Sequence, residues 1–521
     1  MFRVRYRRNP RLPVLAWCER IERDQEVTIT HGEWVETTSD SAVEGAWSGP
    51  LRTHGFGEAL TFTGTGIRVL PHEIQAATPT HTLQTICATK IGRSLLLANS
   101  LAFLLASADD GIDEAYRFYD YDLMSVMDGL RRYVRNIPTR TGRGVRLYYH
   151  SNIRIRDDME VVEERKAGPP AFAEFSDYYE FLLDQTVAVA RNAEHPDRRV
   201  RYRTVTTVSS GYDSPCCAAL AKAAGCREAV TFTTARPGFA DRDDSGRRVA
   251  ESLGMDVAEY DPAAYLGKAG CPEVEMMATG VGGDDVVYLG LEDRLPRVLL
   301  YTGYHGDRVW ARTGVHPTRD IVRGDPSGGS LAEFRLRVGF VNLPVPFIGC
   351  MEHPSIHAIS NSPAMVRWSL GTSYDRPIPR RIAEEAGVPR HLFGRTKKAV
   401  ARPYQTTGTG PENPPMEEWL TAGSQVEFRR FVAKHPPFGS GWDRWRFELM
   451  HQLYQLNRRV LENRRAKDYL NLLHVRPPER VWVHGRYAKR RSEHMVAFHW
   501  AVGKMLQRYT AALTRDQAQS F

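Results

Sequence analysis

The chain has 521 residues, of which 42% are hydrophobic and 25% are charged, and its net charge is +8. This length suits about two to four domains, each with its own core, and the composition is that of an ordinary globular protein. The seven cysteines include no C-x-x-C pair, which argues against a zinc ribbon or a disulfide framework. The modest positive excess suits an anionic ligand such as a nucleotide but is too diffuse to indicate nucleic acid.

The beginning of the chain, from Met1 to Arg5, is charged and is not followed by an apolar run. We therefore expect no secretory signal and a cytoplasmic location. The longest apolar stretch, residues 95–108, is interrupted by polar residues and is too short to span a bilayer. It predicts a buried strand that runs into a core helix, and we expect no membrane partner.

Residues 1–165 are rich in short strand patterns separated by glycine turns, which is typical of a β-rich domain. Strands are predicted at residues 60–62 and 145–149. The charged segment 157–170 ends in Gly168-Pro169-Pro170 and is predicted to be a linker. The first domain is therefore expected to end near residue 165.

Residues 166–416 are expected to form a second domain, in which strand and helix patterns alternate. The predicted strands are 202–208, 228–234, 257–260 and 297–302, and the predicted helices are 176–191, 215–224, 242–253 and 284–295. Such alternation predicts an α/β fold with a doubly wound parallel sheet. Ligands of these sheets bind at the carboxyl ends of the strands, so the residues that follow each strand are the candidate site residues.

Residues 417–521 are predicted to form a helical, basic region that is rich in aromatic residues. Its tryptophans include Trp442, Trp445, Trp482 and Trp500, and its clustered cations are Arg458-Arg459, Arg464-Arg465 and Lys489-Arg490-Arg491. Two interpretations of these cations stay open. They form either a solvated surface of packed helices or a docking surface for an anionic substrate or a partner.

The segment 208–215 reads Val-Ser-Ser-Gly-Tyr-Asp-Ser-Pro and joins a predicted strand to a predicted helix. Ser214 is predicted to cap this helix and Pro215 to occupy its first position. The free N–H groups of the helix start and the serine hydroxyls can hold phosphate oxygens. Gly211 permits close approach of the backbone, and Asp213 can hold Mg²⁺. The chain contains neither a Walker A sequence nor G-x-G-x-x-G, which leaves a Rossmann dinucleotide site without support.

This segment resembles the PP-loop, S-G-G-x-D-S, of the N-type ATP pyrophosphatases. Ser209, Gly211, Asp213 and Ser214 match that pattern, and Ser210 replaces its second glycine. Two later segments are similar to motifs of the asparagine synthetase family. Residues 302–307 resemble its second acidic loop, although Arg308 follows where the family usually has glutamate. Residues 376–390 resemble its late helix and proline turn, and Arg395-Thr396-Lys397 resembles its R-x-K motif.

The resemblance implies that ATP and Mg²⁺ are the cofactors. It assigns Ser209, Ser210, Gly211 and Ser214 to the pyrophosphate, and Asp213 and Asp307 to Mg²⁺. The replacement at Ser210 is expected to narrow the pyrophosphate pocket. Phe232 and Thr233, at the end of the second strand of the predicted sheet, are expected near the adenine because of their position.

Two branches of the family are similar to this chain. In the β-lactam synthetases a tyrosine stands where Tyr304 does and helps to deprotonate the attacking amine, and the macrolactam synthetases that close lasso peptides share the architecture. Lys397 matches the family lysine that stabilises charge as the acyl-adenylate forms and collapses. The alternatives are that Tyr304 is a buried aromatic beside the nucleotide and that Lys397 is a solvated lysine.

Residues 1–165 resemble the N-terminal glutaminase domain of the family, an α+β fold of the Ntn-hydrolase type, in position and in the segment 82–100. Such a glutaminase uses an N-terminal cysteine whose own amine acts as the base. Here Phe2 follows Met1, and Cys18 is internal. The domain is therefore expected to be degenerate and structural, without glutaminase activity.

The resemblance thus implies an ATP-dependent ligase that forms an amide or a lactam through an acyl-adenylate and releases AMP and pyrophosphate. The expected substrate is a small molecule or a peptide with a carboxylate and an amine. Two alternatives stay open, namely a PP-loop enzyme that modifies tRNA or a nucleobase, and a non-catalytic nucleotide-binding scaffold. A homodimer also stays open, whereas a nucleic-acid partner is not expected because the chain lacks cysteine pairs and a zinc module.

Overall fold

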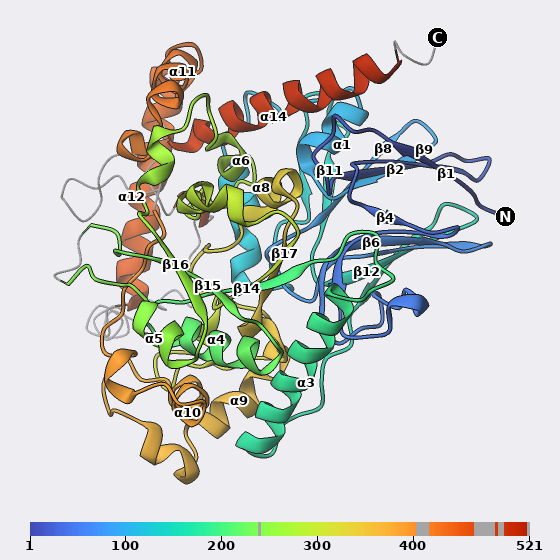
Figure 1. The fold of residues 1–521 in the computed structure, drawn as a ribbon. Coiled ribbons are helices and arrows are strands. Elements are labelled where there is room, and N and C mark those ends of the chain that lie inside the picture. The colour runs from blue at the N-terminus through green and yellow to red at the C-terminus, as the bar shows by residue number, and fades with distance from the viewer. Residues whose placement is uncertain (238–240, 403–415, 463–484, 488–493, 518–521) are drawn as a thin grey trace, which may run out of the picture.

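The protein is described here by a computed structural model that covers residues 1–237, 241–402, 416–462, 485–487 and 494–517. It is a mixed α/β structure with three sheets (Figure 1). Two mainly antiparallel sheets come from the first 165 residues, and one parallel sheet follows them along the chain. The β-rich character expected for the first part of the chain is therefore confirmed.

The two antiparallel sheets face each other in Figure 1. Side chains from both sheets, including Ile29, Leu97, Ile67 and Ile153, pack into one buried cluster between them. The seven-stranded sheet has the order β1 (Arg3–Arg8), β3 (Glu26–His31), β2 (Trp17–Ile21), β9 (Ser94–Ala98), β8 (Ile86–Ile91), β11 (Val145–Tyr148) and β10 (Asn136–Ile137). The six-stranded sheet has the order β13 (Val161–Arg165), β12 (Ser151–Arg156), β7 (Glu73–Ala77), β6 (Phe62–Val69), β5 (Ser41–Trp47) and β4 (Glu36–Thr37).

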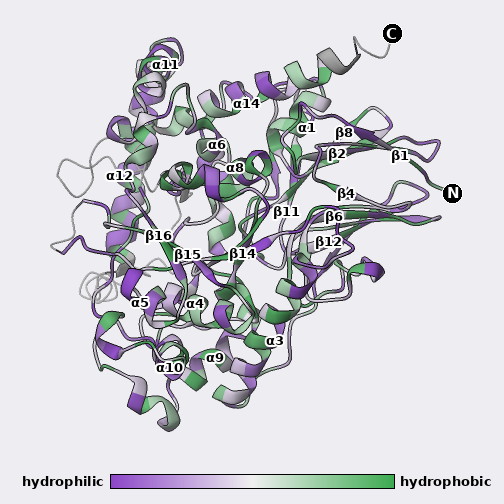
Figure 2. Ribbon diagram, viewed as in Figure 1, coloured by the Kyte–Doolittle hydropathy of each residue, from purple (hydrophilic) through white to green (hydrophobic). Residues whose placement is uncertain are grey.

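Helices cover the outer faces of these two sheets. Helix α1 (Leu101–Ser107) lies between the seven-stranded sheet and the long helix α14 (His494–Gln517), and α3 (Phe175–Ala193) packs on β5 of the other sheet. Figure 2 shows α1 as mostly hydrophobic, as expected for a helix buried on two sides, whereas the edge strand β1 is largely hydrophilic. The predicted strand and core helix of residues 95–108 are thus confirmed as β9 and α1.

The parallel sheet has five strands, and every neighbouring pair in it is parallel. Along β17, Leu299 and Tyr301 pack into one buried cluster with α4 (Asp213–Ala223), while Val298 and Leu300 pack into another with α8 (Leu331–Val338). Helices therefore cover both faces of the sheet at β17, which is why every residue of that strand is buried. The strand order is β16 (Asp256–Tyr260), β15 (Glu228–Phe232), β14 (Arg203–Thr207), β17 (Val298–Thr302) and β18 (Val341–Pro344).

The remaining α-helices surround this sheet or the first part of the chain. Those within the described residues are α2 (Tyr119–Met124), α5 (Arg247–Ser252), α6 (Val274–Met277), α7 (Gly306–Val309), α9 (His353–Ser360), α10 (Pro377–Glu385), α11 (Ala422–Lys434) and α12 (Gly441–Glu462). Among the described residues, no helix combines the length and the apolar character needed to cross a membrane. The helical character predicted after residue 417 is confirmed where the structure describes it. Trp482 and the cation groups 464–465 and 489–491 lie outside the described residues.

Several sequence-based boundaries are wrong. The predicted linker contains strand β13, because Val161–Arg165 pairs with β12 at the sheet edge. The predicted helix 242–253 is helical only at Arg247–Ser252, since Thr234 and Asp243 form a β-bridge that holds the preceding residues extended. Residues Val286–Arg294 form a 3₁₀ helix rather than an α-helix. Strand β18 was not predicted, because four residues are too short to give a period.

A buried ion pair joins the first part of the chain to the helices of the parallel sheet. Arg335 of α8 donates to both carboxylate oxygens of Glu44 on β5, at 2.6 and 2.8 Å, and both side chains are at most 2% exposed. Glu44 also accepts hydrogen bonds from Thr65 and Asn99. Because every charge here is paired and hydrogen-bonded, this contact fixes how the two parts pack.

Candidate functional site

An open cavity lies at the carboxyl ends of β14, β15 and β17. The turn 208–214 follows β14, Phe232 ends β15, and the loop 302–307 follows β17. Parallel strands deliver their carboxyl ends to one edge of a sheet, so segments far apart in sequence meet there. Of the residues selected from the sequence, those that line the cavity are Ser209, Gly211, Asp213, Ser214, Phe232, Tyr304, Asp307 and Lys397.

The serine turn is held by its own hydroxyl groups. The Ser209 N–H donates to Ser214 Oγ at 2.9 Å, the two serine hydroxyls are 2.8 Å apart, and the Gly211 N–H donates to Ser209 Oγ at 3.3 Å. Helix α4 begins at Asp213, so Ser214 lies inside the helix and is not its cap, and Pro215 is not its first residue. The prediction was wrong because Ser214 Oγ bonds back to Ser209 instead of forward to the helix.

Ser210 and Thr233 do not line the cavity. Ser210 Oγ donates to Asp244 Oδ1 at 2.8 Å, and the Ser210 N–H reaches the same oxygen at 3.3 Å. Thr233 directs both its N–H and its hydroxyl to the carbonyl of Tyr260. The hydroxyl that replaces the PP-loop glycine is therefore turned toward Asp244, and its assignment to pyrophosphate stays a prediction.

Asp213, the first residue of α4, has one paired and one unpaired carboxylate oxygen among the described residues. Its Oδ2 accepts a hydrogen bond from Arg376 Nη1, and its Oδ1 is buried and has no hydrogen-bond partner in the part of the chain that the structure describes. Burial raises the pKa of Asp213, and the neighbouring charge of Asp307 raises it further, whereas Arg376 and Lys397 oppose the shift. An orphaned carboxylate oxygen beside a second acid is suited to a cation.

Two glycines let the loop 302–307, which follows β17, pass directly over Asp213. A Cβ atom at Gly306 would lie 2.5 Å from Asp213 Cγ, and one at Gly303 would lie 2.9 Å from Asp213 Cβ. Side chains at these two positions would therefore push the loop away. The glycines bring Asp307, which begins the short helix α7 with Gly306, to the same cavity as Asp213.

The residues fit a magnesium ion that is held only in part by the protein. Among the described residues, no three histidine, cysteine or acidic side chains come together to form a complete metal cage. Asp213 and Asp307 could therefore supply two ligands, and phosphate and water would supply the rest. Mg²⁺ is commonly bound in this way, through one or two carboxylates and substrate phosphates.

Tyr304 is partly buried, and its hydroxyl donates to Asp285 Oδ1 at 3.1 Å. The pKa of Tyr304 lies well above its usual value because the side chain is buried and because Asp285 and Tyr288 are close. The phenol is therefore protonated near neutral pH, and a proton taken up by Tyr304 would have to pass to Asp285. Asp285 also accepts from the Ser330 hydroxyl at 2.5 Å and from the Gly328 N–H at 2.8 and 2.9 Å.

The two lysines of the R-x-K segment have different surroundings. Lys397 is exposed at the cavity and makes no hydrogen bond with any described residue through its ammonium group. Lys398 is nearly buried, and its ammonium group binds Asp241 Oδ2 at 2.6 Å and the Asp243 carbonyl. Of these two lysines, Lys397, which the R-x-K resemblance selected, is therefore the one whose ammonium group is open to a ligand.

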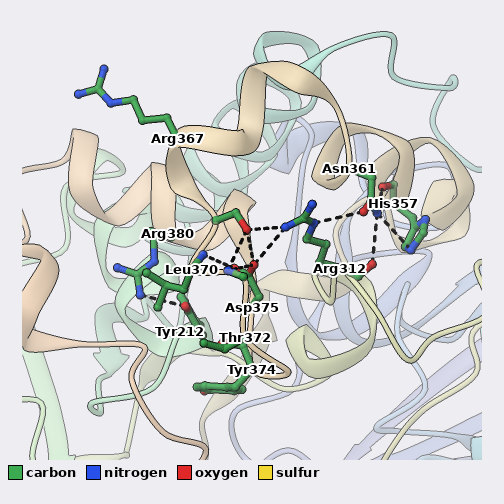
Figure 3. Close-up of polar contacts among 12 residues, drawn as sticks. Tyr212, Arg312, His357, Asn361, Arg367, Leu370, Thr372, Tyr374, Asp375 and Arg380 are labelled. Carbon is green, nitrogen blue, oxygen red and sulfur yellow. Dashed lines mark hydrogen bonds and ion pairs between the residues drawn. The ribbon is translucent and has the colours of Figure 1, made fainter.

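Sequence reasoning assigned no role to Asp244, Asp285, Tyr374 or Arg376, all of which line the cavity. The loop that carries Tyr374 and Arg376 is anchored by Asp375, which accepts hydrogen bonds from the Leu370 and Gly371 N–H groups, both at 3.1 Å, and from Arg312 at 3.4 Å (Figure 3). Figure 3 also shows Arg367 pointing away from this network. The four cavity residues Asp244, Asp285, Tyr374 and Arg376 contact partners that are distant in sequence, so no local pattern could have revealed them.

A comparison of the chain with protein-family models found no match, and a comparison with curated proteins found no significant match. The similarity to the asparagine synthetase family therefore rests on the motifs of the sequence and on the geometry of the cavity.

Proposed function

We propose that the protein is an AMP-forming ligase of the asparagine synthetase and β-lactam synthetase type, with a doubly wound PP-loop domain and a degenerate Ntn-type domain before it. The observation that carries the proposal is the meeting of the serine turn, Asp213, Asp307 and Lys397 in one cavity at the carboxyl edge of a parallel sheet. Hydroxyl and N–H donors suit phosphate oxygens, and paired carboxylates suit Mg²⁺.

In the proposed reaction a carboxylate oxygen of the substrate attacks the α-phosphorus of ATP. The bond from that phosphorus to the bridging oxygen breaks, and pyrophosphate leaves. An amine then attacks the acyl carbon, a C–N bond forms, the bond from carbon to the AMP oxygen breaks, and AMP leaves. The substrate is a small molecule or a peptide that carries a carboxylate, with the amine on the same or on a second molecule.

The residues of the chain have distinct roles in this proposal. Ser209, Gly211 and Ser214 hold the departing pyrophosphate. Asp213 and Asp307 would hold Mg²⁺, which neutralises phosphate charge when it is bound. Lys397 stabilises the negative charge that develops on the reacting groups, and Tyr304 passes the amine proton to Asp285, with which it is hydrogen-bonded.

The nucleotide product tests the proposal. The purified protein is incubated with ATP, Mg²⁺ and a panel of carboxylic acids and amines, and the spent nucleotide is separated by chromatography. AMP and pyrophosphate are the expected products, and ADP as the main product would refute the adenylation mechanism. Mass spectrometry of small molecules retained by the purified protein then identifies the acid and the amine.

A further inference from the structure

Arg376 lies where the loop 369–375 meets helix α10, and its side chain is only 6% exposed. Its Nη1 donates to Asp213 Oδ2, and within the described residues this is the only hydrogen bond of its guanidinium group. A guanidinium carries five N–H donors. Because Arg376 lines the cavity, its other donors are available to a ligand bound there.

The surroundings of Arg376 hold it in place. The guanidinium carbon lies 5.1 Å from the centre of the Tyr374 ring, and that ring packs against Tyr212 of the serine turn with centroids 4.9 Å apart. On the other side, the hydrogen bonds of Asp375 fix the loop (Figure 3). Arg376 is therefore positioned beside the turn 208–214 before any ligand binds, which lowers the entropic cost of binding.

The partner of Arg376 is also the best candidate for a metal ligand. Asp213 Oδ2 is occupied by Arg376, while Oδ1 is buried with no hydrogen bond to a described residue. A divalent cation at Asp213 would have to share the carboxylate with a guanidinium, and the two positive charges would repel each other. Phosphate removes this conflict because a guanidinium binds phosphate with two parallel hydrogen bonds.

We propose that Arg376 binds the polyphosphate of the nucleotide, and that Asp213 is its alternative partner when no phosphate is bound. Phosphate would draw Arg376 away from Asp213 and open the carboxylate to the divalent cation. Metal binding is thereby coupled to nucleotide binding, in the sense that each ligand raises the affinity for the other. This inference rests on the proposed function, because it needs a polyphosphate in the cavity.

The test uses Mn²⁺ and inorganic pyrophosphate as probes on the full-length protein, with binding followed by titration calorimetry. For Arg376→Gln we expect the affinity for pyrophosphate with Mn²⁺ to fall on the order of 10- to 100-fold, the usual effect of losing a charged hydrogen bond. The same variant should bind Mn²⁺ alone on the order of tenfold more tightly than the wild type, because Asp213 is freed. In the double variant Arg376→Gln and Asp213→Asn, this gain in Mn²⁺ affinity should be lost.

Arg381→Gln is the matched control, since Arg381 is on the same helix, pairs with Glu385 and does not line the cavity. It should behave as the wild type. Should Arg376→Gln fail to fold, Arg376→Lys keeps the positive charge and should lose part of the pyrophosphate affinity. If the wild type binds pyrophosphate with Mn²⁺ and both Arg376 variants bind it equally well, the role of Arg376 is refuted. The proposed function would not be affected by that result. Failure of the wild type to bind pyrophosphate or ATP with Mn²⁺ would overturn the proposed function as well.

Discussion

The hydroxyl of Tyr304 donates a hydrogen bond to the buried carboxylate of Asp285, although the two residues belong to different segments around the cavity. This contact changes the role that the sequence assigned to Tyr304. A tyrosine whose pKa is raised by burial is a poor base by itself. Coupled to a carboxylate, it can donate its proton as it receives another, so the pair acts as one unit.

Tyr304→Phe removes the hydroxyl of this pair with little change in shape. We expect amide formation to slow on the order of 10²- to 10⁴-fold, the usual contribution of acid–base catalysis. ATP–pyrophosphate exchange, which needs no deprotonated amine, should change far less. Both rates are measured on the same preparation, with Tyr179→Phe on α3 as the control. Equal losses in the two assays would mean that Tyr304 serves nucleotide binding instead.

Asp213→Asn and Asp307→Asn each remove one expected ligand charge. The Mg²⁺ concentration needed for half-maximal ATP turnover should rise on the order of tenfold or more in each variant, since a charged ligand is replaced by a neutral one. Titration of turnover with Mg²⁺ measures this, and circular dichroism checks the fold. Asp293→Asn, an exposed position in the 3₁₀ helix before β17, is the control. Normal Mg²⁺ dependence in either site variant would refute its metal assignment.

Lys397→Ala should reduce kcat on the order of 10²- to 10³-fold, as loss of one preorganised electrostatic group does. The effect on KM should be small, because a cation that meets charge only in the transition state adds little to substrate binding. Steady-state kinetics separate the two, and Lys222→Ala, an exposed lysine on α4, is the control. An unchanged kcat with a raised KM would make Lys397 a ground-state contact.

Glutamine should not serve as the nitrogen donor. All seven cysteines are buried, and burial raises the pKa of the Cys18 thiol to about 12 and that of the Cys87 thiol further. A glutaminase needs a reactive thiolate, and these thiols stay protonated and covered. The protein is incubated with glutamine, ATP and its substrates, and glutamate is assayed. Glutamate released in step with ATP use would contradict this expectation.

Glu19 makes the stability of the protein depend on pH. Its side chain is fully buried, neither carboxyl oxygen has a hydrogen-bond partner among the described residues, and burial raises its pKa from 4.5 to about 8. The folded state therefore holds a proton that the unfolded state releases, so this group stabilises the fold below pH 4.5. That contribution is lost as the pH rises to about 8, by roughly 5 kcal/mol at most.

Glu19→Gln keeps the shape of the side chain and removes its titration. The variant should gain stability over the wild type as the pH rises from about 5 to 8 and then level off. Urea unfolding across this range measures the difference. Glu26→Gln, an exposed position on the neighbouring strand β3, should show no comparable gain. A difference in stability between Glu19→Gln and the wild type that stays constant with pH would refute the raised pKa of Glu19.

The sequence predicted those elements whose signal is local and repeated. The strand and helix at 95–108 and the helix at 176–191 have clear apolar patterns, and the structure confirms both, as β9 with α1 and as α3. Predictions at segment ends were less accurate. Strand β13 lies in a charged segment and is held by its partner β12. Tertiary pairing overrides local preference there.

The same division applies to the candidate site. By itself the sequence placed Asp213, Tyr304 and Asp307 at the carboxyl edge of the sheet, because their segments follow predicted strands. Lys397 follows no predicted strand and was selected by its resemblance to the R-x-K motif. Only the tertiary structure decided their partners. Arg376 is 163 positions from Asp213, and Asp244 is 34 from Ser210. Contacts over such separations depend on how the elements pack, and no periodicity or spacing along the chain encodes them.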